Sequence, residues 1–331
     1  MGKKIVTIGE VMMRLSTVEK ERFVQVDAMK VVYGGSEANV CISLAQLGLE
    51  AYHVTAFPVH DLGQAASNYL RQMGVKTDFV LEGEGRLGLY FLEDGAMQRA
   101  PRIIYDRFDN AFSKLDPARL DWEKILDGAD WFHWSGITPA LSQNAADMTL
   151  EALKVAKSKG IMVSGDINYR RNLWQYGKGP LDIMPELVRY SHVLVAGLTD
   201  FENCLDIQSD DFEDACRQAK KDFPQIKYIT KTNRDSISAS HNKLKGFLWN
   251  GTETLKSKRY DMPNIIDRIG GGDAFMAGLI YGLLHFDDQK AIEFATAASV
   301  LKHSIPGDAN LVHLDEVMEV MKGKDIGKLK R

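Results

Sequence analysis

Apolar segments typical of buried strands alternate with longer helical segments along most of the 331-residue chain. Glycines that commonly end helices, such as Gly48, Gly74 and Gly160, separate several of these segments. This alternation predicts an α/β fold with a doubly wound, mostly parallel sheet and helices on both faces. The expected strands cover 5–9, 51–56, 77–81, 131–134, 161–167, 192–196 and 226–230, and the expected helices cover 37–47, 62–72, 142–159, 181–188 and 210–221. In folds of this kind, ligands bind beyond the carboxyl ends of the strands.

Two stretches, 11–33 and 86–107, have the pattern of strands without a helix between them. Within the second stretch, we expect 87–92 and 97–105 to pair as a hairpin through the turn 93–96. Strands inserted in this way into a doubly wound fold predict a small β-sheet. We expect both stretches to form such a sheet and to cover the ligand site as a lid.

Composition and charge exclude several classes of protein. The net charge of −4 at pH 7 gives no basic field for nucleic acid or an anionic membrane. Apolar runs stay below the roughly 18 residues that a membrane helix needs. The three cysteines, Cys41, Cys204 and Cys216, lack metal or disulfide spacing. We expect a soluble cytoplasmic protein with no nucleic-acid or membrane partner, and with a frayed basic tail over 322–331.

The segment Gly270-Gly271-Gly272-Asp273 runs directly into an apolar helix rich in small residues. Glycines at a helix start expose backbone N–H groups, and the helix adds partial positive charge there. The segment can therefore hold a transferring phosphate, while the carboxylate of Asp273 takes a proton from an alcohol. The alternative is an ordinary tight turn with an acidic N-cap. Both the dinucleotide-binding glycine fingerprint and the P-loop are absent.

Small residues recur on the helix after Asp273 and on the following helical segment. They predict two helices in tight contact. They are Ala274, Ala277, Gly278, Ala295, Ala297, Ala298 and Ser299.

Two motifs, Gly34-Gly35-Ser-Glu-Ala-Asn39 and Gly270–Asp273, lie in this order near the two ends of the chain. With them the chain resembles the ribokinase-like (PfkB) carbohydrate kinases over nearly its whole length. The resemblance implies one kinase domain over residues 1–331, with a small β-sheet lid and with ATP and Mg²⁺ as cofactors. The stretch 166–174 further resembles the subgroup that phosphorylates the sugar acid 2-keto-3-deoxygluconate.

The resemblance also implies roles for individual residues. Asp273 would be the catalytic base, and the amides of Gly270, Gly271 and Gly272 would hold the phosphoryl group. The implied sugar-acid contacts are Gly34, Gly35, Asn39, Tyr90, Tyr105, Arg107, Arg170 and Asp308, and the implied nucleotide contacts are Asn168, Arg170, Lys231, Asn233, Gly270 and Gly272.

Several of these residues could instead have a purely structural role. Arg107 could form a surface ion pair with Asp106 or Asp109, and the two tyrosines could serve only to pack the lid. Asp308 lies in a Pro-Gly-Asp segment that is also a common turn. Asn39 could simply belong to a helix start.

The sequence departs from the family pattern at two places. Arg268 stands where members usually have a small hydroxyl or branched residue, which puts the details of the nucleotide pocket in doubt. The usual Asn-x-x-Glu motif for magnesium is replaced by a segment with Asp200 and Glu202, so the metal ligands stay unassigned.

The sequence predicts a kinase that phosphorylates the terminal hydroxyl of the sugar acid. Another sugar kinase of the family, acting on fructose or ribose, remains an alternative. A catalytically silent sugar- or nucleotide-binding homologue is a second one. Because an exposed lid sheet has free edges and an apolar face, we also expect a homo-oligomer that forms through the lid.

Overall fold

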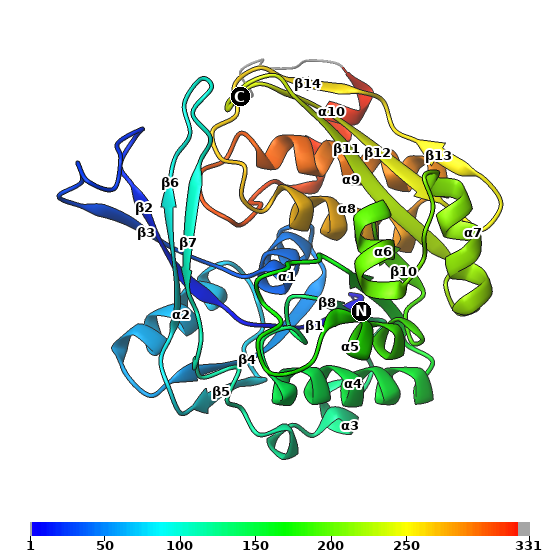
Figure 1. The fold of residues 1–331 in the computed structure, drawn as a ribbon, viewed down its shortest axis with the longest axis horizontal. Coiled ribbons are helices and arrows are strands. Elements are labelled where there is room, and N and C mark those ends of the chain that lie inside the picture. Colours follow the sequence, from blue (N-terminus) through cyan, green and yellow to red (C-terminus); the bar gives the residue numbers. More distant parts are fainter. Residues whose placement is uncertain (1, 324–331) are drawn as a thin grey trace.

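The computed structural model describes residues 2–323 and consists of a central sheet between two helical layers, with a small second sheet at one side (Figure 1). The central sheet has the strand order β13-β12-β11-β10-β9-β8-β1-β4-β5, and β14 pairs with β12. In this order, each neighbouring pair between β11 and β5 is parallel. The pairs β11-β12, β12-β13 and β12-β14 are antiparallel. Its strands are β1 Lys4–Ile8, β4 Glu50–Pro58, β5 Val80–Gly83, β8 Trp131–Ser135, β9 Met162–Asp166, β10 Val193–Val195, β11 Tyr228–Ser236, β12 Asn242–Trp249, β13 Thr254–Lys256 and β14 Tyr260–Met262.

Each face of the central sheet packs against its own group of helices. One apolar core lies under α3, α4, α5, α6 and α7, and the other lies under α1, α2, α8, α9 and α10. The helices are α1 Ser36–Gln46, α2 Asp61–Gln72, α3 Trp122–Ile125, α4 Gln143–Ser158, α5 Pro180–Val188, α6 Leu198–Leu205, α7 Phe212–Asp222, α8 Gly271–His285, α9 Asp288–Lys302 and α10 Leu314–Lys322, and a short 3₁₀ turn covers Pro117–Arg119. The predicted doubly wound, mostly parallel sheet is confirmed.

The small sheet has four strands in the order β3-β2-β6-β7. Its strands are β2 Met12–Thr17, β3 Met29–Gly34, β6 Gly88–Glu93 and β7 Arg102–Asp106. They come from the two stretches that were expected to form a separate sheet. At the far end of the β6–β7 hairpin, the carbonyl of Met97 accepts a hydrogen bond from Ala239 N in the β11–β12 loop (2.9 Å).

Several boundaries differ from the sequence prediction. The strand expected at 77–81 begins only at Val80, because residues 78 and 79 form a turn. The β6–β7 hairpin has a wider tip than predicted, since Met97 has a positive φ of 51° and β7 starts at Arg102. Helices α3, α6 and α10 and strands β12 to β14 were not predicted. Most of the basic tail, 324–331, lies outside the described residues.

Helices α8 and α9 pack closely, as their small residues predicted. A Cβ atom at Gly278 would lie 2.8 Å from Cα of Ala295 and 3.0 Å from Cβ of Ala298. The same holds one turn later, where a Cβ atom at Gly282 would lie 2.7 Å from Cα of Ala291. The two helix backbones can therefore approach each other only because these positions have no side chain.

We expect Gly278→Val to lower the free energy of unfolding by about 1–3 kcal/mol, because overpacking forces the two helices apart. Urea denaturation of the purified protein measures this change. The control is Lys154→Val on the exposed side of α4, where the substitution changes only helix propensity and costs at most about 0.7 kcal/mol. Equal decreases in the free energy of unfolding for the two variants would contradict the packing explanation.

Within residues 2–323, each helix is too short or too polar to cross a lipid bilayer.

Candidate active site

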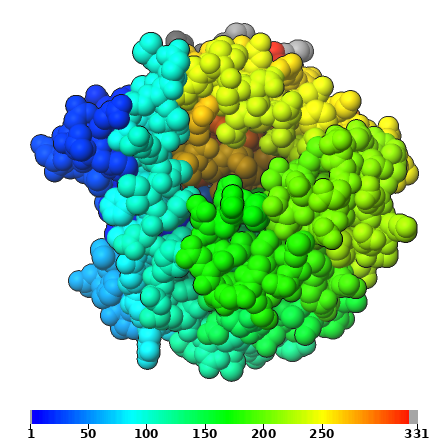
Figure 2. All heavy atoms as spheres, in the orientation of Figure 1, coloured from blue at the N-terminus to red at the C-terminus, as the bar shows by residue number. Residues whose placement is uncertain are grey.

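A cavity of about 360 Å³ lies where the carboxyl ends of β1 and β9 meet the start of α8. Figure 2 shows this region as a hollow between the cyan atoms of the small sheet, the green central segment and the yellow β11–β12 region. The gold atoms of the segment that leads into α8 lie at the back of the hollow. This position agrees with the rule that α/β sheets bind ligands beyond their carboxyl edge.

The cavity brings together most of the residues that the sequence singled out. Those that line it are Gly34, Gly35, Asn39, Tyr90, Tyr105, Arg107, Asn168, Arg170, Gly270, Gly271, Gly272, Asp273 and Asp308. Lys231 and Asn233 are not among its lining residues. Both lie in β11, and the ammonium of Lys231 packs over the ring of Phe212 (4.3 Å).

Asp273 is held by two donors from the first turn of α1. Its Oδ1 accepts a hydrogen bond from Ser36 Oγ (3.0 Å), and its Oδ2 accepts one from Asn39 Nδ2 (2.7 Å). Burial raises the pKa of Asp273 from 3.8 to about 6, and these two hydrogen bonds limit the rise. The carboxylate is thus fixed in direction and close to the pH range in which a general base works well.

The turn before Asp273 requires glycine at its first position. Gly270 has a positive φ of 79°, and a Cβ atom there would lie 1.8 Å from the carbonyl oxygen of Asp308. Helix α8 begins at Gly271, so the N–H groups of its first turn have no partner within the helix. Ser299 Oγ on α9 donates a hydrogen bond to the carbonyl of Gly271 (2.7 Å), and the imidazole of His303, which follows the end of α9, packs against Gly271.

The glycines before α1 are needed because other groups approach them closely. A Cβ atom at Gly35 would lie 2.0 Å from the carbonyl oxygen of Glu10, and one at Gly34 would lie 2.1 Å from Oδ2 of Asp308. Because Gly34 and Gly35 have no side chains, their backbone is exposed to the cavity. A ligand can therefore approach the main chain at this point.

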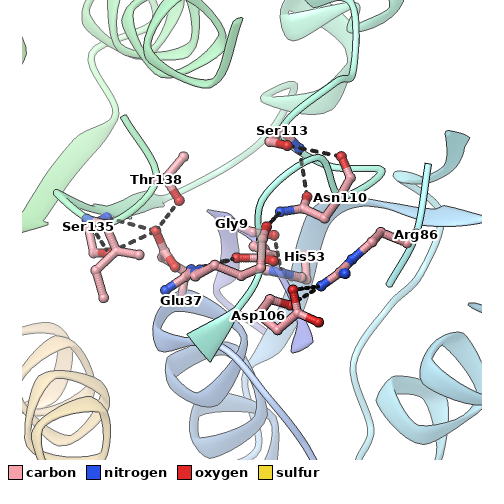
Figure 3. A network of polar contacts seen from close by, with 12 residues as sticks. Gly9, Glu37, His53, Arg86, Asp106, Asn110, Ser113, Ser135 and Thr138 are labelled. Atoms are coloured by element: carbon pink, nitrogen blue, oxygen red, sulfur yellow. Dashed lines mark hydrogen bonds and ion pairs between the residues drawn. The ribbon is translucent and has the colours of Figure 1, made fainter. Parts of the chain in front are cut away.

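Arg107 is buried and pairs with Glu10, which follows the end of β1. Arg107 Nε donates to Glu10 Oε2 (2.9 Å), and Nη2 donates to the same oxygen. The backbone of Arg107 is fixed by Asn110, whose Nδ2 donates to its carbonyl (2.6 Å) and whose Oδ1 accepts from Ser113 N (2.8 Å; Figure 3). The alternative of a surface ion pair is wrong, because Arg107 is buried, Asp106 pairs with Arg86 (Figure 3) and Asp109 pairs with Lys114.

Arg170 and Asn168 follow the end of β9 and face the cavity. Asn168 has a positive φ of 43°, a conformation that asparagine tolerates better than most residues. At the strand end, Asp166 also lines the cavity. Burial raises the pKa of Asp166 well above its usual value, and the charges of Asp200 and Asp273 raise it further, while Arg170 lowers it.

A buried charge network joins the small sheet to the loops around α8 and α9. Arg14 in β2 donates from Nη1 to Asp308 Oδ1 and from Nη2 to Asp267 Oδ2, both at 2.8 Å. Asp308 also accepts a hydrogen bond from the hydroxyl of Tyr90 in β6. Asp308 is therefore more than a residue of a simple turn, and Tyr90 does more than pack, although its ring also lies 5.8 Å from that of Tyr105.

Glu37, within the Gly-Gly-Ser-Glu-Ala-Asn motif, is buried at the edge of the cavity. Its Oε1 accepts hydrogen bonds from Ser135 Oγ (2.9 Å) and Thr138 Oγ1 (2.6 Å; Figure 3). Burial raises its pKa to about 7, and the hydrogen bonds from Thr138 and Ser135 oppose the rise. These contacts join α1 to the carboxyl end of β8, so they help to orient Ser36 and Asn39 toward Asp273.

The two acidic residues considered for magnesium lie elsewhere. Both carboxylate oxygens of Asp200 accept backbone hydrogen bonds, from Tyr169 N (3.1 Å) and Gly197 N (2.8 Å), and so begin α6. Glu202 is exposed on α6 and does not line the cavity. Among residues 2–323, no group of three or more acidic, histidine or cysteine side chains could hold a metal by itself.

Sequence reasoning missed several groups around the cavity. Asp166 and Glu10 could have been found from the sequence, because each comes at or just after the end of a predicted strand, where ligands bind in this kind of fold. Ser36 and Glu37 lie within a motif that was recognised for its glycines and asparagine alone. Arg14 gave no local signal, since its two carboxylate partners lie near the other end of the chain.

The chain is similar to known carbohydrate kinases over its whole length. The model of the "pfkB family carbohydrate kinase" matches residues 2–313. A relative from Haloferax volcanii, named 2-dehydro-3-deoxygalactonokinase, is 31% identical, with 99% of each chain covered. The 2-dehydro-3-deoxygluconokinase of Bacillus subtilis strain 168 is 26% identical, with 92% of this chain and 90% of the relative covered.

The solved structures include a similar protein with the same arrangement of elements. The crystal structure of 2-dehydro-3-deoxygluconokinase from Thermotoga maritima is 42% identical to this chain, with a TM-score of 0.92. The match covers 97% of this chain and 100% of that one. On the family match and these full-length similarities, the chain belongs to the PfkB family of carbohydrate kinases.

Proposed function

We propose that the protein transfers the γ-phosphoryl group of ATP to the terminal hydroxyl of 2-keto-3-deoxygluconate. The observation that carries this proposal is the Asp273 carboxylate, fixed by two α1 donors at the start of α8, where the first amides have no partner within the helix. A base for an alcohol and donors for a phosphoryl group thus share one cavity. The names of the relatives from Thermotoga maritima and Bacillus subtilis support the choice of sugar acid.

In the proposed reaction, the hydroxyl oxygen of the sugar acid forms a bond to the γ-phosphorus while the bond to the leaving β-phosphate oxygen breaks. Asp273 accepts the hydroxyl proton, and ADP leaves with the electron pair of the broken bond. The amides of Gly270, Gly271 and Gly272 stabilise the charge on the transferring oxygens. To this reaction the chain's own residues contribute positioning, one base and a row of fixed donors.

The carboxylate of the sugar acid calls for a cation in the cavity. Arg170 has no ion pair among the described residues. Arg107 uses only Nε and Nη2 to donate to Glu10. Both guanidinium groups can therefore donate charge-assisted hydrogen bonds to a carboxylate. The remaining proposed sugar-acid contacts are Gly34, Gly35, Asn39, Tyr90, Tyr105 and Asp308.

The proposed nucleotide contacts are Gly270, Gly272, Asn168 and Arg170, all at the cavity. Lys231 and Asn233 do not line the cavity, and they stay proposed contacts to a phosphate or the ribose of the nucleotide. Magnesium usually binds one or two carboxylates together with substrate phosphates. Asp166 fits this role, because its carboxylate faces the cavity and its pKa is raised by burial and acidic neighbours. Bound Mg²⁺ would neutralise phosphate charge.

We further propose that residues 1–331 form one kinase domain whose small sheet acts as the lid, which would exclude water as a competing nucleophile. Exposed apolar side chains on this sheet, among them Val31 and Ile104, support a homo-oligomer that forms through the lid. Light scattering at micromolar concentration tests this, and a monomer would contradict it. We also propose a cytoplasmic location.

A coupled ADP-release screen tests the proposed function. We expect turnover with 2-keto-3-deoxygluconate to exceed turnover with fructose and ribose at equal ATP. The name of the Haloferax volcanii relative makes 2-keto-3-deoxygalactonate a necessary second acid in the screen. A clear preference for fructose would overturn the sugar-acid assignment. Calorimetric binding of sugar and nucleotide without any ADP release would indicate a silent homologue.

The raised pKa of Asp273 predicts the acidic side of the pH profile. The base must be ionised, so kcat should fall as pH decreases through about 6 rather than through the usual aspartate range. Ser36→Ala removes a hydrogen bond that stabilises the carboxylate, so the fall should move to higher pH. Steady-state rates between pH 4.5 and 8 measure both profiles, with fluorescence as a check on folding. A Ser36→Ala profile displaced to lower pH would contradict this assignment.

A further inference from the structure

Two arginines that the proposed reaction has not used line the same cavity as Gly270–Asp273. Arg234 lies near the end of β11, and Arg268 lies in the segment that joins β14 to α8. The yellow and gold segments that carry them border the hollow in Figure 2. Arg268 is also one of the two places at which this chain departs from the family pattern.

Neither arginine has a carboxylate partner among residues 2–323. Arg268 Nη2 donates to two neutral acceptors, Asn242 Oδ1 (2.7 Å) and the carbonyl of Ser238 (3.2 Å). Its Nε is buried without a partner. The guanidinium of Arg234 makes no hydrogen bond or ion pair within the described chain. Arg14 and Arg107, in contrast, each pair with buried carboxylates.

The two guanidinium groups lie close enough to repel each other. Although the side chain of Arg234 is exposed to solvent, partial desolvation by the surrounding chain lowers its pKa, and the charge of Arg268 lowers it further. Burial also lowers the pKa of Arg268. An arginine remains protonated near neutral pH even so. The pair is therefore a concentration of positive charge that an anion entering the cavity would neutralise.

The position of the pair indicates which anion it fits. Arg268 precedes Gly270 by two residues, so its charge lies beside the amides proposed to receive the phosphoryl group. A nucleoside triphosphate carries several negative charges, whereas a helix start supplies only about half an elementary charge. Guanidinium forks match phosphate oxygens well. The single charge of the sugar acid is already met by Arg107 and Arg170.

We infer that Arg234 and Arg268 form a clamp for the β- and γ-phosphates of the donor nucleotide. This inference rests on the proposed kinase function and adds two binding residues to it. The fixed contacts of Arg268 with Asn242 and Ser238 hold one arm of the clamp in place before the nucleotide arrives. Arg234, which lacks such contacts, is the arm that closes onto the phosphates.

Calorimetric titration with ATP, ADP and AMP at fixed Mg²⁺ tests the clamp in Arg234→Met and Arg268→Met. Hydrogen bonds to charged groups contribute about 1.5–3 kcal/mol, so each variant should bind ATP and ADP about 10- to 100-fold more weakly. AMP lacks the outer phosphates, so its Kd should not change between wild type and variants. The KM of the sugar acid should also remain unchanged. Arg189→Met, an exposed arginine after α5, is the matched control and should bind all three nucleotides normally.

Three results would overturn the clamp: unchanged ATP affinity in both variants, an equal loss for AMP, or a raised sugar-acid KM with normal ATP binding. If Arg268→Met fails to fold, Arg234→Met decides, because the guanidinium of Arg234 makes no hydrogen bond or ion pair within residues 2–323. A different result would contradict the proposed function. A wild-type protein that binds ATP but phosphorylates no sugar acid or sugar would remove the kinase assignment, while the nucleotide titrations would still decide the clamp.

Discussion

Replacing Asp273 with asparagine should lower kcat by about 10²–10⁴-fold, because the variant keeps the shape of the side chain but loses the proton acceptor. The amide can still accept a hydrogen bond from Ser36 or Asn39, so the first turns of α1 and α8 should keep their positions. Affinity for ATP should change little, since the proposed phosphate contacts are the backbone amides of the glycine turn and the two clamp arginines, all of which the substitution leaves in place. A coupled ADP-release assay at saturating substrates measures kcat, and calorimetry measures ATP binding.

The control for this change is Asp222→Asn, which removes a carboxylate from the exposed end of α7. That variant should retain normal kcat, and circular dichroism should show the same fold for both proteins. An Asp273→Asn protein with kcat within a few-fold of wild type would remove Asp273 from the role of base. Lost turnover together with lost secondary structure would indicate a structural role instead.

The Arg14→Met variant should show the largest loss of stability. The substitution leaves the carboxylates of Asp267 and Asp308 buried without their main cation. Removing one partner of a buried ion pair typically costs about 3–5 kcal/mol, because the remaining charge is no longer compensated. Urea denaturation at pH 7 measures the change in the free energy of unfolding.

An exposed ion pair provides the comparison for Arg14. Arg217 pairs with Glu213 one turn away on α7, and Arg217→Met should cost only about 0.3–0.5 kcal/mol. The double variant Arg14→Met with Asp308→Asn should recover part of the lost stability, because it removes one of the two uncompensated charges. Similar losses for Arg14→Met and Arg217→Met would show that the buried network contributes little.

Local patterns were sufficient to predict the framework of the fold. The strands β1, β4, β8, β9 and β10 and the helices α1, α2, α4 and α5 come from clear apolar segments that alternate along the chain. The glycine turn with Asp273 lies at the start of α8. The antiparallel strands β12 to β14 could not be predicted in the same way. Their polar residues alternate with apolar ones over short segments, and pairing with β11 depends on neighbours that the local pattern does not specify.

The cavity was predictable only where its residues belong to compact motifs. Gly34, Asn39 and Asp273 could be found because they lie within or beside runs of glycine. The partner of Arg107 could not, since Glu10 lies 97 positions away along the chain. Arg14 and Asp308 are 294 positions apart, and only the assembled fold brings them together.

The small sheet is anchored very unequally along its length. Near Arg14 it is tied to the body by buried charged groups, whereas within residues 2–323 the β6–β7 tip is tied by one main-chain hydrogen bond, between Ala239 and Met97. Such a bond has a net value of about 0.5–1.5 kcal/mol, so thermal motion breaks it often. The small sheet should consequently bend along its length. The part near Arg14 should stay in place while the β6–β7 tip moves, and the sheet should not rotate as one rigid body.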